Sequence, residues 1–223
     1  MATRNDVEIR VVDDPAREAA DLLIAAAGHV ALSGGSAPGP AYELAARLRP
    51  DWSGAHVWFG DDRAVPPDDE LSNYRLAKET LLDRLTAPPE VHRILGELGA
   101  EKAADLYDEE LEGVTLDLAL NGIGPDGHTA SLFPGAATLE EKERRAVAAE
   151  GKLEPFVARV TMTPPVFAEA ELLVYLVLGA DKAEVVRRAF ADDPSPEIPA
   201  SLIRGRRTIA ILDSGAASLL PQG

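Results

Sequence analysis

The sequence predicts an α/β fold with a mostly parallel sheet that is covered by helices on both faces. Segments with the pattern of strands and segments with the pattern of helices alternate along the chain. The clearest strand candidates, LLVYLVL at residues 172–178 and TIAIL at 208–212, are almost continuously apolar. Strands of this kind are buried on both faces, as in parallel sheets between helices. The length of 223 residues suits one α/β domain, so residues 1–223 are expected to form a single domain.

Each element follows in order from its apolar spacing and its end signals. Strands are predicted at residues 7–12, 29–33, 55–60, 91–95, 114–120, 172–178 and 208–212. Helices are predicted between them, at residues 15–27, 38–49, 72–85, 100–111 and 182–190, with a last helical turn at 215–219. Pro15 and Pro38 suit the first turn of a helix, where an N–H has no partner within the helix. Residues 135–165 are the least regular, and an added hairpin or helix over the site is expected there.

Charge and composition exclude several classes of function. With 38 acidic and 22 basic side chains the net charge is −16, which disfavours nucleic acid as a partner. No apolar run approaches the ~20 residues that cross a bilayer, so no membrane association is expected. The absence of cysteine excludes disulfides and agrees with a cytoplasmic protein, and the N-terminal residues show no apolar core of a signal peptide. Because the acidic field would repel a phosphorylated metabolite, local positive groups would have to bind one.

The most informative segment is NGIGPDGHTASLFPG at residues 121–135, directly after the apolar run at 114–120. Open α/β sheets bind ligands outside the carboxyl ends of their strands, and Gly122, Gly124 and Gly127 would let the backbone approach a ligand closely. His128 is of the residue type whose ordinary pKa of about 6.5 allows it to act as base and as acid near neutral pH. The segment is interpreted as a catalytic turn, in which Asp126 is a candidate partner of the histidine.

Two loops at other strand ends are candidates for binding an anion. SGGSAP at residues 33–38 precedes a helix, whose start offers free N–H groups and the positive end of the helix dipole. The amides of Gly34, Gly35 and Ser36 could hold a phosphate, and a tight turn with Ser36 as N-cap explains the segment equally well. Arg63, in GDDR after the third predicted strand, could stabilise an oxyanion or bind a carboxylate or phosphate. In isolation, an exposed acidic loop with a charge-balancing arginine is the simpler interpretation of GDDR.

Two further cations stand beside predicted strands. Arg159 begins RVTMTP, whose alternation suggests a short strand, and it could reach a phosphate or be an ordinary arginine at a strand edge. Lys182 lies in GADKAE, where Asp181 and Glu184 have the spacing of an N-cap and capping box. That spacing puts Lys182 in the first helical turn, where a cation opposes the helix dipole at a cost of ~0.3–1 kcal/mol. A phosphate bound there would reverse the effect; a solvated lysine is the alternative.

Together these segments make the chain resemble the 6-phosphogluconolactonase family, in the superfamily that also holds the glucosamine-6-phosphate deaminases. The similar segments span about residues 32–205 and read LSGGSAPGPAYELAA, WFGDDRAVPPDDELSNYRLAKETLL, LDLALNGIGPDGHTASLFPG, RVTMTPPVF, LLVYLVLGADKAEVVRRAF and PASLIRG. The resemblance implies a modified doubly wound, Rossmann-like sheet. It also implies hydrolysis of 6-phospho-D-glucono-1,5-lactone to 6-phospho-D-gluconate in the oxidative pentose phosphate pathway. The chain departs from the family at Ala37, where threonine is usual, and at Asp62, where glutamate is usual.

With this resemblance, the residues suggest a mechanism. We expect His128 to take a proton from the water that attacks C1 and then, as an imidazolium, to protonate the ring oxygen. Asp126 would orient the imidazole or favour its charged form. Arg63 would stabilise negative charge on the lactone or bind the substrate in another way. The expected ligands of the 6-phosphate are Gly34, Gly35, Ser36, Arg159 and Lys182.

Two other functions stand as alternatives. A sugar-phosphate deaminase or isomerase of the same fold would carry an acidic residue downstream of Asp-Gly-His, where this chain has TASLFP at residues 129–134. A non-catalytic sugar-phosphate sensor usually carries a DNA-binding segment, and the sequence has no basic helix-turn-helix candidate. No spacing typical of a metal site occurs, so His29, His56 and His92 are interpreted as structural or solvent-facing and no catalytic metal or cofactor is expected. We expect a monomer, because no exposed apolar helix argues for a dimer.

Overall fold

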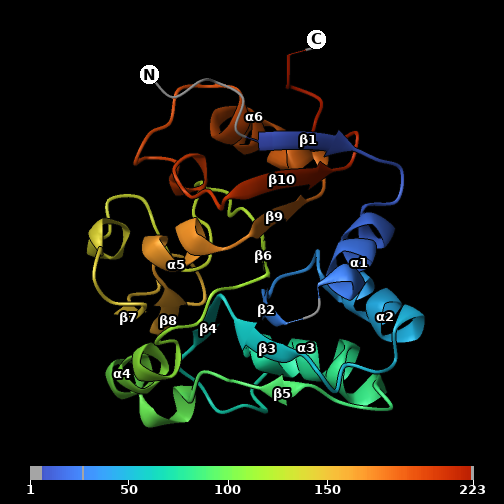
Figure 1. The fold of residues 1–223 in the computed structure, drawn as a ribbon. Coiled ribbons are helices and arrows are strands. Elements are labelled where there is room, and N and C mark those ends of the chain that lie inside the picture. The colour runs from blue at the N-terminus through green and yellow to red at the C-terminus, as the bar shows by residue number, and fades with distance from the viewer. Residues whose placement is uncertain (1–6, 27, 222–223) are drawn as a thin grey trace.

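The computed structural model describes residues 7–26 and 28–221, and a seven-stranded sheet runs through its centre (Figure 1). The strands lie in the order β1-β10-β9-β6-β2-β3-β5, and each neighbouring pair is parallel. Their bounds are β1 Val7–Val11, β2 His29–Leu32, β3 His56–Phe59, β5 Glu90–Val91, β6 Leu118–Asn121, β9 Leu172–Val177 and β10 Arg207–Leu212. The predicted α/β class with a mostly parallel sheet is confirmed.

The order of the strands reverses between β2 and β6. From β2 the chain continues to β3 and β5 towards one edge, whereas from β6 it continues to β9 and β10 towards the other. A crevice forms at such a switch point, beyond the carboxyl ends of the strands, and open α/β sheets bind their ligands there. The loops that leave β2, β6 and β9 carry the glycine-rich and basic segments of the sequence.

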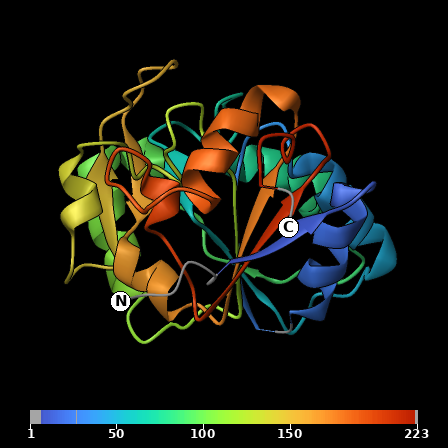
Figure 2. The ribbon, with the colours of Figure 1, turned by 90° about the horizontal axis from the view of Figure 1, so that it is seen from above.

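Helices cover both faces of the sheet, with α1 and α2 on one side and α4 and α5 on the other (Figures 1 and 2). The α-helices are α1 Pro15–Ala25, α2 Gly39–Leu48, α3 Asn73–Thr80, α4 Ala100–Glu110, α5 Pro164–Glu169 and α6 Ala183–Phe190. The 3₁₀ helices are η1 Leu82–Arg84, η2 Gly96–Leu98, η3 Ala137–Glu140, η4 Ala180–Lys182 and η5 Pro199–Ser201. In the described part of the chain, no helix combines the length and apolar character needed to cross a membrane.

A second, antiparallel sheet of three strands continues from β3. It consists of β4 Asp61–Arg63, β8 Arg159–Met162 and β7 Ala146–Ala149, in that order. β7 and β8 pair antiparallel and are the added hairpin that the sequence predicts within residues 135–165. The register of β4 and β8 sets Arg63 opposite Arg159. The small sheet therefore brings two basic segments that are far apart in the sequence to one place.

Two predicted strands are shorter than expected. The strand predicted at residues 114–120 begins only at Leu118 and ends at Asn121, because residues 114–117, which follow the turn at 111–113, are not paired as a regular strand. The strand predicted at 91–95 is only the two-residue β5, although its partner β3 accepts one more hydrogen bond from the His92 amide. Apolar composition alone does not reveal where the pairing of such strands ends.

The remaining differences lie in short elements. Residues 215–219 form hydrogen-bonded turns rather than the predicted helical turn. The helix predicted at 15–27 ends at Ala25, and residue 27 lies outside the described residues. β4 and α5 were not expected, because three charged residues have no strand periodicity and a six-residue helix has too few turns to show a pattern.

Candidate active site

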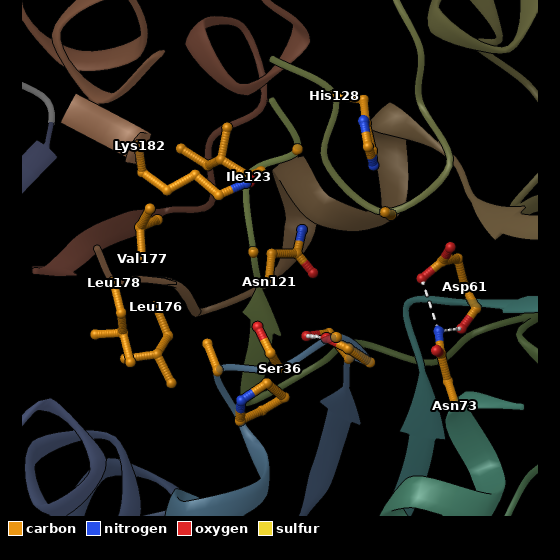
Figure 3. Close-up of a pocket in the computed structure, with 18 of the residues that line it drawn as sticks. Ser36, Asp61, Asn73, Asn121, Ile123, His128, Leu176, Val177, Leu178 and Lys182 are labelled. Carbon is orange, nitrogen blue, oxygen red and sulfur yellow. Dashed lines mark hydrogen bonds between the residues drawn. The ribbon is translucent and has the colours of Figure 1, made fainter. Parts of the chain in front are cut away.

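A cavity of about 300 Å³ opens at the switch point, where β2, β6 and β9 end (Figure 3). Its walls come from five parts of the chain: the loop after β2, the turn after β6, the end of β9 with Lys182, the small sheet, and the start of α3 at Asn73. Of the residues predicted to form the site, those that line the cavity are Gly34, Gly35, Ser36, Arg63, His128, Arg159 and Lys182. Asp126 does not line the cavity but contacts His128.

The imidazole of His128 is held by Asp126. Asp126 Oδ1 lies 2.5 Å from His128 Nδ1, and the same oxygen accepts the His128 backbone N–H at 3.1 Å. Burial acts to raise the pKa of Asp126, but the hydrogen bond and charge of His128 outweigh it and leave that pKa below its ordinary value. A carboxylate at Nδ1 favours the tautomer that carries its proton there. His128 Nε2 is then left with the lone pair that can accept a proton.

Glycines shape the turn that presents His128. A Cβ built on Gly124 would lie 2.0 Å from both Cε1 and Nδ1 of the imidazole, so the ring sits directly against the Gly124 backbone. Gly127 has a φ of +89°, and a Cβ there would lie 2.7 Å from Ile198 Cδ1. The ring of Phe133 packs 4.6 Å from the imidazole, between centroids. The turn therefore needs glycine at these two positions for different reasons, close approach at one and a left-handed backbone at the other.

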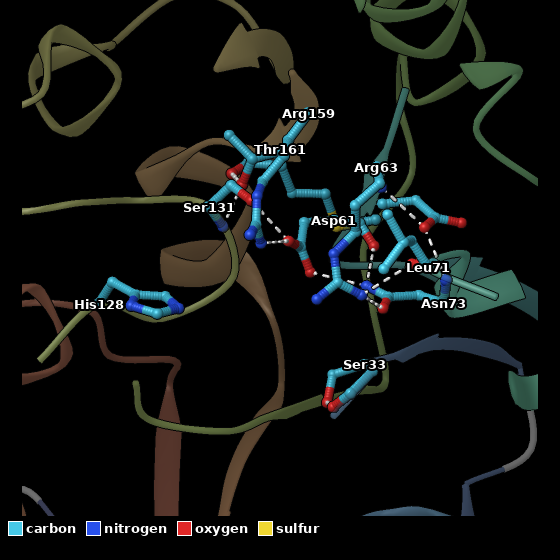
Figure 4. A network of polar contacts seen from close by, with 12 residues as sticks. Ser33, Asp61, Arg63, Leu71, Asn73, His128, Ser131, Arg159 and Thr161 are labelled. Carbon is cyan, nitrogen blue, oxygen red and sulfur yellow. Dashed lines mark hydrogen bonds and ion pairs between the residues drawn. The ribbon is translucent and has the colours of Figure 1, made fainter. Parts of the chain in front are cut away.

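Arg63 and Arg159 form a pair of like charges across β4 and β8 (Figure 4). Arg159 is only 5% exposed, and burial lowers its pKa. Its guanidinium lies over the ring of Phe133 at 5.5 Å, and its Nη1 is 3.9 Å from Asp61 Oδ2. Like charges directly opposite one another destabilise a strand pair, so this arrangement calls for an anion beside it. Arg159, which the sequence predicts to bind the phosphate together with Lys182, is instead paired with Arg63 across the small sheet.

Asp61 and Asn73, which the sequence analysis did not assign to the site, hold this pair in place. Asn73 Nδ2 donates to the Asp61 backbone carbonyl at 2.8 Å, and Arg63 Nη1 donates to Asn73 Oδ1 and, at 3.0 Å, to the Leu71 carbonyl. Ser131 Oγ donates to Asp61 Oδ2 at 2.6 Å. Gly34 is in close contact with this group, because a Cβ there would lie 1.8 Å from Asn73 Oδ1.

Asp62 has a supporting position outside the cavity wall. Its carboxylate accepts the backbone N–H of Asn73 at 2.7 Å and of Tyr74 at 3.0 Å, together with the Ser72 hydroxyl at 3.1 Å. Burial raises the pKa of Asp62 to about 6, against the hydrogen bonds that these amides donate. Asp61 and Asp62 are 6% and 2% exposed, so the interpretation of GDDR as an exposed acidic loop is wrong.

Lys182 lies across the cavity from Asp61 and Asn73 (Figure 3). Its Nζ donates to the Ile123 carbonyl at 3.0 Å, and no carboxylate among the described residues forms an ion pair with it. The predicted capping box is absent, because η4 ends at Lys182 and makes this residue, not Asp181, the N-cap of α6. Glu184 instead binds Arg187 at 2.8 Å. The positive charge of Lys182 is therefore available to a ligand in the cavity.

The loop after β2 forms a further part of the cavity wall. α2 begins at Gly39 with Pro38 as its N-cap, so Ser36 does not cap the helix as the alternative interpretation required. Gly35 has a φ of +93°, and a Cβ there would meet nothing within 4 Å. Gly34, Gly35 and Ser36 therefore line the cavity, and none of them caps α2.

Asn121, the last residue of β6, is a cavity residue to which the sequence analysis gave no role. It is 2% exposed, and neither its side-chain nitrogen nor its oxygen has a hydrogen-bond partner in the described structure. The sequence feature that could have indicated a role for Asn121 is its position at the end of a strand, directly before the glycine-rich turn. A buried amide without partners disfavours the fold unless a ligand or water satisfies it.

A family model, sequence relatives and solved structures all relate this chain to the same group of sugar-phosphate enzymes. The family model described as glucosamine-6-phosphate isomerases/6-phosphogluconolactonase matches residues 3–211. The 6-phosphogluconolactonase of Haemophilus influenzae is 33% identical over 205 residues, which cover 86% of this chain and 87% of that protein. The crystal structure of 6-phosphogluconolactonase from Thermotoga maritima superposes with a TM-score of 0.84 at 28% identity, covering 93% of this chain and 99% of that one. A monomeric glucosamine-6-phosphate deaminase shares the fold, with a TM-score of 0.82 at 19% identity over 96% and 99% of the two chains.

Proposed function

Because the chain belongs to the family of glucosamine-6-phosphate isomerases and 6-phosphogluconolactonases, we propose that it hydrolyses 6-phospho-D-glucono-1,5-lactone to 6-phospho-D-gluconate with His128 as the base. This activity is a step of the oxidative pentose phosphate pathway. Curated relatives from several bacteria carry the name 6-phosphogluconolactonase at 33–35% identity. The observation that carries the mechanism is the Asp126-bound imidazole at a cavity that also contains three cationic side chains.

The proposed reaction needs no covalent intermediate, because the lactone is an activated ester. His128 Nε2 takes a proton from water as the water oxygen bonds to C1, which forms a tetrahedral intermediate. The intermediate collapses with cleavage of the bond from C1 to the ring oxygen, and the imidazolium returns its proton to that oxygen. Asp126 keeps Nδ1–H engaged throughout and stabilises the imidazolium between the two proton transfers.

Arg63 and Arg159 are proposed to stabilise the negative charge that develops on the lactone carbonyl oxygen. The pair lies on the same small sheet and brings two positive charges together in a largely buried place, where electrostatic stabilisation is strongest. Asp61 offsets only one of these charges. An oxyanion beside the pair would relieve the repulsion that is otherwise built into the sheet.

Replacing Arg159 with alanine tests this assignment against the phosphate role that the sequence suggests. We expect kcat/KM to fall on the order of 10-fold, since a hydrogen bond to a charged group contributes about 1.5 kcal/mol. The loss should be similar for the phosphorylated lactone and for D-glucono-1,5-lactone, which has no phosphate. Arg206→Ala, at an exposed arginine outside the cavity, is the control. A loss confined to the phosphorylated substrate would place Arg159 on the phosphate.

Lys182 and the loop from Gly34 to Ser36 are proposed to bind the 6-phosphate. Lys182 supplies a positive charge that no carboxylate of the described chain neutralises, and Gly34, Gly35 and Ser36 line the same cavity. Together with the arginine pair they give the local positive charge that a chain of net charge −16 needs in order to bind an anionic substrate.

Lys182→Ala is expected to raise KM for the phosphorylated lactone roughly 10-fold with little change in kcat, because the phosphate is bound equally in the ground and transition states. The KM for D-glucono-1,5-lactone should not change, and this substrate comparison is the decisive measurement. Lys78→Ala, at an exposed lysine paired with Asp83, is the matched control. An unchanged KM for the phosphorylated lactone would remove Lys182 from the site.

The activity itself is tested by generating the lactone in situ and comparing its decay with and without the protein. A deaminase of the same family would instead release ammonia from glucosamine 6-phosphate, and the absence of an acidic residue in TASLFP at 129–134 argues against it. Binding without turnover would favour a sensor. We also propose that the chain acts as a monomer, and light scattering in solution tests this.

A further inference from the structure

A cluster of two histidines and a glutamate lies at the opposite end of the sheet from the cavity. His56 begins β3, Glu90 begins β5, and His92 follows β5. His56 and Glu90 are register partners in the parallel pair, and His92 stands two residues beyond Glu90. Since side chains alternate along a strand, all three leave the same face of the sheet. The cavity lies beyond the other end of β3, about 10 Å further along the strand at 3.3 Å per residue.

The ligand atoms of these three side chains have the spacing of a metal site. His56 Nδ1 lies 3.0 Å from His92 Nε2 and 3.6 Å from Glu90 Oε2, and His92 Nε2 lies 3.8 Å from Glu90 Oε1. Around a tetrahedral zinc ion with bonds of about 2.0–2.1 Å, neighbouring ligand atoms are separated by about 3.4 Å. The two Glu90 distances belong to different carboxylate oxygens, so a rotation of the exposed Glu90 side chain, with small shifts of the imidazoles, would bring one oxygen and both nitrogens around one ion.

The surroundings hold His92 in the orientation that a metal ligand needs. Its Nδ1 lies 2.6 Å from Glu110 Oε1, at the end of α4, so a proton at Nδ1 is donated to a carboxylate. Such a carboxylate behind a histidine fixes its tautomer and raises its basicity towards a metal. The indole of Trp58 stacks on the same imidazole, with centroids 3.9 Å apart and an interplanar angle of 5°. His92 Nε2 is therefore directed, with its lone pair, at His56 and Glu90.

In the absence of an ion, His56 and His92 satisfy each other through one hydrogen bond. A metal would displace that bond, and the Nδ1 proton of His56 would move to Nε2 of the same neutral ring, so that both facing nitrogens could donate lone pairs. Access is open, because the His56 and Glu90 side chains are 36% and 67% exposed while His92 is 11% exposed. The carboxylates of Glu90 and Glu110 add local negative charge that favours a cation.

We propose that His56, Glu90 and His92 bind a divalent first-row transition metal ion, with zinc as the best match, and that water occupies the fourth position. Two imidazoles and one carboxylate form a ligand set that zinc accepts. The ion would join the short edge strand β5 to β3 and, through Glu110, to α4. It takes no part in the proposed lactone hydrolysis, so the two proposals can fail separately.

The test is a calorimetric titration of chelator-treated, full-length protein with Zn²⁺, supported by the visible absorption of Co²⁺. We expect saturable binding of one ion per chain and a Tm that rises with Zn²⁺ concentration. Glu90→Gln should weaken binding at least 10-fold, and His92→Gln should abolish it. Glu90 is exposed, so its variant keeps the test valid if His92→Gln fails to fold. Glu101→Gln, a matched change at the exposed start of α4, and His128→Asn should both bind as the parent does.

Three results would overturn the proposal. The first is the absence of saturable binding to the parent protein. The second is unchanged affinity in Glu90→Gln, which would remove the carboxylate from the site. The third is loss of binding in His128→Asn, which would move the ion to the cavity and leave His56 and His92 as a hydrogen-bonded pair.

Discussion

His128→Asn should lower kcat by ~10²–10⁴-fold, the usual contribution of a general base, while the fold stays intact. Asparagine is polar and smaller than histidine, and the 18% exposed imidazole is not part of the buried core. The variant lacks the nitrogen that accepts the proton of the attacking water. Asp126 cannot replace it, because its contacting oxygen points at Nδ1, on the ring side away from the Nε2 lone pair.

The measurement must separate catalysis from the spontaneous hydrolysis of the lactone. The lactone is generated in situ, and its decay is followed with the parent protein, with the variant and without protein. Binding of 6-phosphogluconate by the variant shows that the cavity persists, and its Tm shows that the fold does. A kcat close to that of the parent would contradict the mechanism.

The central sheet could be predicted well from the sequence, because the residues within each strand carry the apolar pattern that identifies it. β9 and β10 are continuous apolar runs, and each is bounded by a turn or a helix signal. β4 is different: its three residues are two aspartates and an arginine, and it exists as a strand only because β8 pairs with it. Pairing between segments far apart in the sequence has no local signal, so β4 could not be found from residue patterns.

The same distinction applies to the site. His128 and Asp126 were identified together because they lie two residues apart in one glycine-rich turn. Asp61 and Ser131 meet across 70 residues, and no pattern in the sequence pairs them. Arg159 was recognised as a candidate cation, but only the strand register shows that it lies opposite Arg63. Sequence thus identified most of the charged groups, whereas their grouping depends on the tertiary structure.

Gly124→Ala should reduce kcat on the order of 10²-fold without unfolding the protein. The backbone at Gly124 is not left-handed, so alanine is compatible with it. The new Cβ would lie 2.0 Å from His128 Cε1 and Nδ1, and only 2.8 Å from Nε2, so the imidazole must move. A side chain moves more cheaply than a backbone, and the ring can swing away from Asp126 at little cost in stability. A displacement of about 1 Å at a catalytic group can cost 10²-fold in rate.

Alanine substitutions at two other glycines serve as controls, because they show whether any glycine-to-alanine change in this protein lowers the activity. Gly54→Ala meets no atom within 4 Å and lies outside the cavity, so it should keep both the activity and the Tm of the parent. Gly127→Ala imposes a side chain on a left-handed backbone and presses on Ile198, so it should lower the Tm. Of the three variants, only Gly124→Ala should lose activity while keeping its Tm, because there the three atoms nearest to the added methyl group all belong to the His128 imidazole. Full activity of Gly124→Ala would mean that the position of the His128 ring in this turn does not control the reaction.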